Sequence, residues 1–179
     1  MPSPIQTPRL SLRPLKPEDF YFIRSLHTDL QVMKFIGDGV ARTYDQTRAA
    51  VDKYLELGLN DPHLGMWVAY LKDSQIPVGN LLIRKPATQE ETLGIEIGYS
   101  FAQEFWGQGF ATEACRGILD YVKVALGPTR LVALIEPRNE ASRNILNKLG
   151  FKSVGNTLYL DPATGQSKPT EILELKPLE

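Results

Sequence analysis

The glycine-rich segment 106–114, WGQGFATEA, has the residue types that best suit anion binding. It follows an alternating, strand-like run at 95–101 and opens a helix-like run that reaches about Leu126. A helix start presents unpaired backbone N–H groups and the positive end of the helix dipole, and both favour a phosphate. Gly107 and Gly109 let a phosphate approach the main chain, because no Cβ is in the way. The segment therefore predicts a site for a phosphorylated ligand.

Two common phosphate-binding loops fit this segment badly. A Walker loop ends in Gly-Lys-Ser/Thr, whereas Phe110 and Ala111 follow Gly109 here. A dinucleotide fingerprint needs a third glycine where this chain has Thr112, and its turn follows the strand directly, whereas residues 102–106 intervene here. A glycine-containing helix start without a ligand is the remaining alternative for this segment taken alone.

A second segment helps to decide which kind of phosphorylated ligand the Gly-x-Gly turn binds. A buried-type strand at 131–135 is followed by EPRNEAS at 136–142, by a second helix and by the pair Gly150-Phe151. This order of strand, Gly-x-Gly turn, helix, strand, Asn-x-x-Ser, helix and Gly-Phe resembles the GCN5-related N-acetyltransferase (GNAT) superfamily. The resemblance is strongest to the RimJ/RimL-type branch, which includes the ribosomal-protein N-terminal acetyltransferases, and it covers about residues 8–175.

The resemblance implies a binding mode for acetyl-CoA. In the family a Gln/Arg-x-x-Gly-x-Gly/Ala segment binds the pyrophosphate; here Trp106 occupies the Gln/Arg position, as in the branch's Trp-Gly-x-Gly variant. Pantetheine pairs with the preceding strand, and a backbone N–H polarises the thioester carbonyl; here the N–H of Tyr99 is the expected oxyanion donor. The cofactor-binding residues expected are Ile97, Tyr99, Phe101, Trp106, Gly107, Gln108, Gly109, Phe110, Ala111, Thr112, Asn139, Ser142 and Arg143.

Glu96 is the candidate general base, because acyl transfer to an amine needs a neutral nitrogen. The alternative is a solvated strand residue, or one that only orients the substrate. Strand alternation puts Glu96, Gly98 and Ser100 on one face and Ile97 and Tyr99 on the other. A glycine inside a strand often marks a bulge or a close backbone approach.

Ser142 lies three residues after Asn139, on the same helical face. Many family members use a tyrosine to protonate the departing coenzyme A thiolate, but this chain has Leu146 at that position; the resemblance to Asn-x-x-Ser enzymes gives the role to Ser142. Asn139 resembles a pantetheine-contacting residue and also suits a helix N-cap. Arg143 either approaches a coenzyme phosphate or is solvated.

The pattern of apolar residues and breakers predicts the elements that position these groups. Strands are expected at 9–13, 66–72, 76–84, 93–101, 131–135, 151–160 and 171–175, and helices at 17–26, 29–36, 43–57, 111–126 and 139–149. Thr43 and Gln46 form a capping box, and Gly58 is the expected helix stop. The order predicts an α+β fold: a central, mostly antiparallel, splayed sheet of about six to seven strands flanked by helices, forming a single domain over residues 1–179.

Composition limits the partners. The 179 residues are 42% hydrophobic and have a formal net charge of −1, which gives no reason to expect nucleic acid or a membrane as partner. No signal peptide is recognisable, and the single Cys115, expected to pack inside a helix, suits a cytoplasmic location. His27 and His63 lack metal-ligand spacing, so no metal is implied.

These observations predict an enzyme that moves an acetyl group from acetyl-CoA to a primary amine by direct transfer in a ternary complex. The alternative is a non-catalytic acetyl-CoA or CoA-binding sensor or partner module of the same fold. No sequence motif identifies the acceptor, which is either a protein N-terminus or a small-molecule amine. The sequence is compatible with both a monomer and a homodimer.

Overall fold

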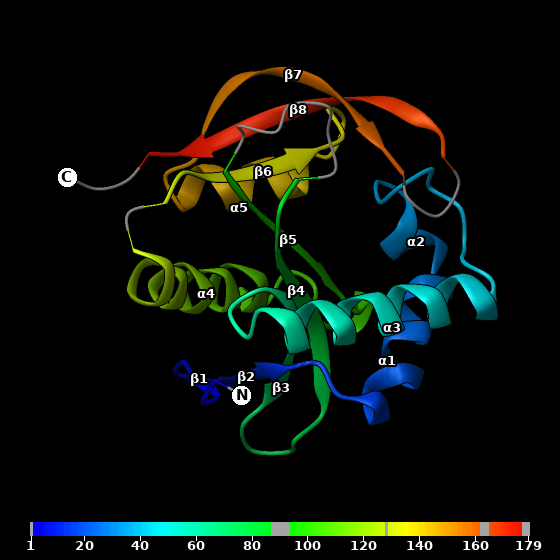
Figure 1. Cartoon of the computed structure of the whole chain (residues 1–179), viewed down its shortest axis with the longest axis vertical. Helices are drawn as coiled ribbons and strands as arrows, with labels where there is room; N and C mark the ends of the chain where they lie inside the picture. The colour runs from blue at the N-terminus through cyan, green and yellow to red at the C-terminus, as the bar shows by residue number, and fades with distance from the viewer. Residues whose placement is uncertain (1, 87–93, 128, 162–164, 177–179) are drawn as a thin grey trace.

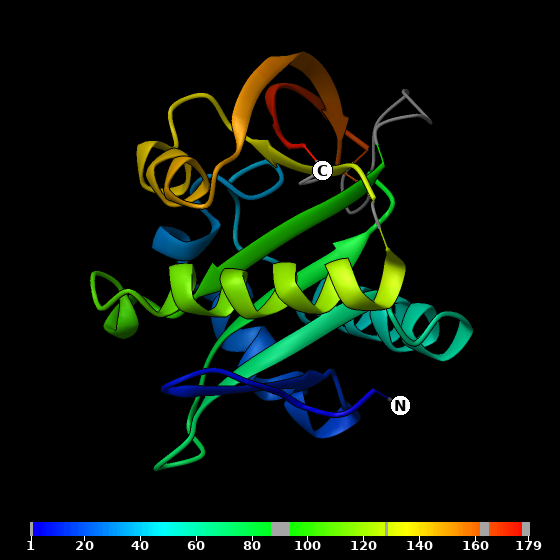
Figure 2. The same cartoon turned by 90° about the vertical axis from the view of Figure 1, so that its left-hand side faces the viewer.

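The computed structural model describes residues 2–86, 94–127, 129–161 and 165–176. Over these residues one sheet contains eight strands in the order β1-β2-β3-β4-β5-β6-β8-β7. Helix α4 lies across one face of the central strands, and α1 and α3 lie on the other (Figures 1 and 2). The expected α+β class and the splayed, mostly antiparallel sheet are confirmed.

The first five strands form an antiparallel meander, and the later strands join it through a parallel pair. Among the described strands, β5 and β6 are the one parallel pair; β8 lies between β6 and β7 and is antiparallel to both. The strands are β1 (Ile5–Gln6), β2 (Leu10–Pro14), β3 (Gly65–Leu71), β4 (Pro77–Arg84), β5 (Ile95–Phe101), β6 (Leu131–Ile135), β7 (Lys152–Leu160) and β8 (Ser167–Leu175).

The helices flank this sheet. They are α1 (Phe20–Thr28), preceded by a 3₁₀ turn at Pro17–Asp19, α2 (Leu30–Met33), α3 (Tyr44–Asn60), α4 (Phe110–Leu126) and α5 (Glu140–Lys148). The capping box of Thr43 and Gln46 begins α3 as expected. No helix in the described part of the chain is both long and apolar enough to cross a membrane.

Alternation along β4 separates two hydrophobic clusters. Leu81 and Ile83 pack in the larger cluster with residues of α4, whereas Leu82 packs against the cluster formed by α1, α3 and β3. Because successive strand residues face opposite sides of a sheet, the same strand anchors helices on both faces. The central strands are thereby held between two apolar layers.

Several sequence-based boundaries are wrong. Gly58 does not stop α3: it has no left-handed backbone conformation, and the helix continues to Asn60. A Cβ there would lie 3.7 Å from the Leu64 carbonyl oxygen, an ordinary contact distance, so the passing chain does not require a glycine at this position. The helix expected over 29–36 ends at Met33, and Gly37 takes a left-handed conformation with φ of 55°.

The sheet also differs at its ends. The eighth strand is β1, whose two residues are too few to show an alternating pattern. Strand β8 starts at Ser167 rather than 171, with Pro169 opposite Leu158 in the ladder. Leu93, expected at the start of β5, Pro128, expected to help stop α4, and Pro162–Thr164, expected in the β7–β8 turn, lie outside the described residues.

Candidate active site

Strands β5 and β6 separate soon after they begin. They pair only at Ile95–Leu131 and Glu96–Val132. The Ile95 N–H donates to the Arg130 carbonyl on the β6 side (2.9 Å), whereas the N–H of Ala102 donates to Val78 on the β4 side (2.9 Å).

Alternate N–H groups of a strand point to opposite neighbours. The N–H of Tyr99 therefore points to the β6 side, like that of Ile95, three residues past the last β5–β6 pairing at Glu96. Ile97 and Phe101 share this direction. The three backbone positions expected to contact pantetheine thus face the side from which β6 has diverged.

The phosphate-loop residues form a turn with two left-handed glycines before α4. Gly107 and Gly109 have φ of 74° and 82°, and Gly109 is the N-cap without a capping side chain. The N–H groups of the first helical turn, from Phe110 to Thr112, are therefore available for an anion. The side chain of Phe110 is buried in the core, which leaves only its backbone for a ligand.

Trp106 has a structural role that the sequence did not indicate. Its indole N–H donates to the Phe101 carbonyl (2.7 Å), which joins the end of β5 to the start of the loop. The Gln108 side chain likewise donates to the Glu104 carbonyl (3.0 Å). Both side chains brace the turn, and contacts between them and the coenzyme stay a prediction.

The N-terminal residues Thr7 and Arg9 hold the phosphate loop in place through hydrogen bonds to Glu113 and Gln108. Glu113 accepts hydrogen bonds from the Thr7 hydroxyl (2.6 Å), the Arg9 N–H (2.7 Å) and the Arg9 guanidinium (2.7 Å). Arg9 also donates to the Gln108 carbonyl (3.0 Å) and stacks on the Phe110 ring. Burial raises the pKa of Glu113, but these hydrogen bonds outweigh it and hold the pKa below its ordinary value. Glu113 therefore fixes the loop as an anion.

Asn139, Ser142 and Tyr99 form one hydrogen-bonded group. The Asn139 side chain caps α5 by accepting from the Ser142 N–H (3.1 Å), which confirms its expected capping role. The Tyr99 hydroxyl lies 2.9 Å from Ser142 Oγ and also donates to the Ser142 carbonyl (3.2 Å). Burial raises the pKa of Tyr99, so its phenol stays protonated and orients Ser142.

Glu96 is buried and already paired. Both of its carboxylate oxygens accept from the Arg84 guanidinium, at 3.0 and 2.9 Å, and Arg84 also donates to the Tyr54 hydroxyl (2.9 Å). Burial lowers the pKa of Arg84, but the charge of Glu96 outweighs it and raises that pKa well above its ordinary value. The expected base is thus a carboxylate fixed in one orientation.

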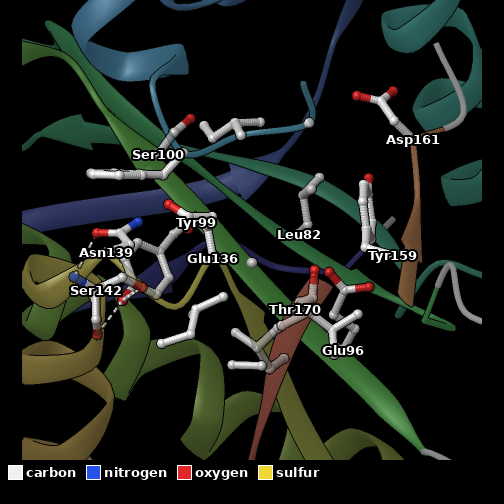
Figure 3. A pocket seen from close by; sticks show the side chains of 18 of the residues that line it. Leu82, Glu96, Tyr99, Ser100, Glu136, Asn139, Ser142, Tyr159, Asp161 and Thr170 are labelled. Carbon is white, nitrogen blue, oxygen red and sulfur yellow. Dashed lines mark hydrogen bonds between the residues drawn. The ribbon is translucent and has the colours of Figure 1, made fainter. Parts of the chain in front are cut away.

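A cavity of about 230 Å³ brings most of the candidate groups together. Its walls come from β4, β5 and the end of β6, from the segment between α2 and α3, and from β7 and β8. Figure 3 shows Ser142, Asn139 and Tyr99 on one side of this cavity and Glu96 and Tyr159 on another. The polar lining that the sequence did not single out includes Arg42, Tyr54, Asn80, Arg84, Ser100, Glu136, Tyr159, Asp161, Lys168 and Thr170.

Arg143 is turned away from this cavity. Its guanidinium donates to Glu171 (2.7 Å) and to the Pro137 carbonyl (2.8 Å). The expected approach to a coenzyme phosphate would require that pairing to be given up. Cys115 is a core residue, as expected, and Trp67 is buried in the core as well.

Comparisons with known proteins agree with this arrangement. The family model for the acetyltransferase (GNAT) domain matches residues 9–152, so the chain belongs to the GNAT family and is an acetyl-CoA-dependent N-acetyltransferase. A Bacillus licheniformis N-acetyltransferase, p20, is 27% identical over 90% of this chain and 89% of its own. Spermidine N(1)-acetyltransferase of Escherichia coli K12 is 23% identical over 84% and 76%.

The fold also matches solved structures. The ribosomal L7/L12 α-N-protein acetyltransferase RimL, in complex with coenzyme A, superposes with a TM-score of 0.78. The alignment covers 98% of both chains at 16% sequence identity. At this identity the likeness shows the fold alone, and that fold is one that holds coenzyme A in the neighbour.

Proposed function

We propose that this enzyme transfers the acetyl group directly to a primary amine bound in the cavity beside the β5–β6 gap. One observation supports this most strongly: a single cavity contains both Glu96 and Ser142 and is lined by Tyr99, whose N–H faces the gap. Direct transfer also agrees with the burial of Cys115, which keeps the thiol away from the cavity lining.

Backbone and side-chain groups of three elements are proposed to bind acetyl-CoA. The N–H groups at the start of α4 bind the pyrophosphate, with Gly107 and Gly109 giving it access to the main chain. The pantetheine arm pairs with β5 through Ile97, Tyr99 and Phe101, and reaches Asn139 at the start of α5. No role is proposed for Arg143, because its charge is already matched by Glu171.

Three groups of the protein act in the transfer. The neutral amine nitrogen attacks the thioester carbon, and the C–S bond breaks as the amide forms. The Tyr99 N–H stabilises the negative charge that develops on the carbonyl oxygen, an effect worth about 3–4 kcal/mol for one such donor. The amine proton leaves through a water held by Glu96. Ser142 hydrogen-bonds the departing thiolate, which takes its proton from solvent.

The acceptor is a primary amine on a protein N-terminus or a small molecule. The names of RimL and of the spermidine acetyltransferase give one example of each kind. We propose a cytoplasmic enzyme without nucleic acid or membrane partners, working as a monomer or homodimer without a metal.

An amine-panel assay tests the proposal. The protein is incubated with acetyl-CoA and protein N-terminal peptides, polyamines or amino acids, and thiol release is read together with product mass. Acetylated amine formed with an equal amount of free coenzyme A is the expected result. Acetyl-CoA binding without thiol release for any amine would instead indicate the non-catalytic binding module.

A further inference from the structure

Most charges that line the cavity are paired within the protein. Arg84 binds Glu96 with two hydrogen bonds, and Arg42 binds Asp161 at 2.6 Å. Both sites are buried: the Arg84–Glu96 pair is neutral overall, and Arg42 is shared between Asp161 and Asp38, which it also binds at 3.1 Å. These residues form part of the cavity wall, and recognition of a charged ligand falls to other residues of the lining.

Glu136 has one carboxylate oxygen without a hydrogen-bond partner among the described residues. It directly follows β6, lines the cavity, and its side chain is only 11% exposed. One carboxylate oxygen accepts from the Arg138 guanidinium (2.9 Å), whereas the other, Oε2, is buried and has no hydrogen-bond partner among the described residues. An unsatisfied buried carboxylate oxygen is costly, and a ligand donor would remove that cost.

The Glu136 carboxylate is in its anionic form. Burial raises its pKa, but the hydrogen bonds from Arg138 and the charges of Arg138 and Lys168 outweigh this and lower the pKa below its ordinary value. An anion with an open oxygen is a suitable partner for an amine or ammonium N–H. Figure 3 shows Glu136 on the side of the cavity that holds Tyr99 and Asn139.

Lys168 presents the opposite charge to the same cavity. The last β6–β8 pair is Ile135–Glu171, and continuing that register past the end of β6 makes Lys168, on the same face of β8 as Thr170, the diagonal neighbour of Glu136. The two side chains are near enough for the charge of each to shift the pKa of the other. No ion pair or hydrogen bond of the Lys168 ammonium exists within the described residues, although the side chain is partly buried and lines the cavity. Diagonal positions lie about 7–8 Å apart at the backbone, and the described residues show no direct ion pair between these two side chains, so a small ligand can bridge them.

We propose that Glu136 and Lys168 select an acceptor with an amine beside a carboxylate, that is, a small amino carboxylate of the α-amino-acid type. This rests on the proposed function. Glu136 accepts an N–H of the reacting amine on the Ser142 side, and Lys168 binds the carboxylate. A polyamine would place a second cation at Lys168, and a protein N-terminus offers a neutral amide there.

The test compares matched acceptors. Glycine and the L-amino acids that have a primary α-amine are each paired with their amide, which keeps the amine and lacks the anionic group. The kcat/KM ratio within each pair, expressed on the concentration of neutral amine because the amine of the amide has the lower pKa, reports carboxylate recognition. We expect at least one amino acid to exceed its amide by about tenfold or more, the effect of one charge-assisted hydrogen bond. Lys168→Met should bring that ratio close to one while the amide reacts as before. Lys168→Arg should keep most of it, and Lys152→Met, at an exposed lysine of β7, should leave it unchanged.

Glu136→Gln separates the two ends of the site. It should raise KM for amino acid and amide alike, because both share the amine, and leave acetyl-CoA binding by calorimetry unchanged. Equal reaction of amino acids and amides in the wild type would overturn the inference and leave the acetyltransferase intact.

A binding measurement covers the remaining cases. Amino acids titrated into the protein with coenzyme A should bind, and Lys168→Met should weaken them. If this holds without any acetylation, the site stands and the proposed transfer to it falls. If no amino acid binds or reacts, the inference is wrong.

Discussion

At the scale of single residues, Ser142 and Glu96 differ in how many partners hold them. Within the described part of the chain, the Ser142 hydroxyl has Tyr99 as its one side-chain partner (2.9 Å), whereas both oxygens of Glu96 accept hydrogen bonds from Arg84. A group with one partner can bind an additional ligand atom at little cost. A carboxylate in a bidentate pair acts more readily by holding a water than by leaving its partner.

Ser142→Ala should lower kcat by roughly tenfold to a thousandfold, because the departing thiolate loses its hydrogen-bond donor. Tyr99→Phe should give a smaller loss, since it only frees the serine side chain. Thiol release with the best acceptor measures both variants. Wild-type turnover in Ser142→Ala would mean that the serine is structural and that water alone protonates coenzyme A.

Glu96→Gln should lower kcat, and the deficit should shrink as the pH rises, because more of the acceptor amine is then neutral without help. A pH–kcat profile of both proteins measures this. Melting temperature is the necessary control, since breaking a buried ion pair typically costs about 3–5 kcal/mol. Full activity with an unchanged profile would remove Glu96 from the mechanism.

The sequence predicted the residues that a motif marks, and it missed those that only packing brings together. Asn139 and Ser142 stand at a fixed spacing, so their position at the start of a helix could be predicted. Glu136 and Lys168 are 32 positions apart in sequence and meet only through the β6–β8 register. Arg143 and Glu171 are likewise 28 positions apart, and their pairing joins α5 to β8.

At the scale of elements, the start of α4 combines a backbone conformation with an electrostatic field. Gly109 has a φ of 82°, which asparagine tolerates better than most residues, and a Cβ there would meet only Arg9, at 3.5 Å. The open N–H groups beyond it carry the positive end of the helix dipole. Conformation and charge at this position can therefore be tested separately.

Gly109→Asp should weaken acetyl-CoA binding severely, whereas Gly109→Asn, of the same shape, should weaken it much less. The negative charge opposes the pyrophosphate, and the amide does not. Calorimetric titration of both folded variants measures the difference. Equal affinity for the Asp variant and wild type would mean that the pyrophosphate binds elsewhere.

Helix starts were easier to predict than helix ends. Thr43 and Asn139 cap their helices through side-chain hydrogen bonds that a local sequence pattern already indicates. Gly58 looked like a stop because glycine often ends helices, but it has no left-handed conformation and the helix continues to Asn60. Glycine permits a helix end without requiring one, so this residue alone did not mark the end of α3.

At the scale of the whole molecule, acid should destabilise the fold partly through His27. The partly buried imidazole lies 3.2 Å from the Thr47 hydroxyl, and burial and the nearby Arg42 lower its pKa from 6.5 to about 4. The unfolded chain then binds a proton at a higher pH than the folded one. Stability should fall as the pH drops from 6.5 towards 4. His27→Gln should flatten this part of a denaturant-midpoint profile, and an identical slope in both proteins would exclude His27 as the cause.

Initial-rate kinetics with both substrates varied test the central claim, direct transfer in a ternary complex, most directly. Acetyl-CoA and the best acceptor amine must be bound together, so double-reciprocal lines should intersect, and intact-protein mass after acetyl-CoA alone should stay unchanged. Parallel lines together with a protein heavier by one acetyl group would show a covalent acetyl-enzyme and contradict the account.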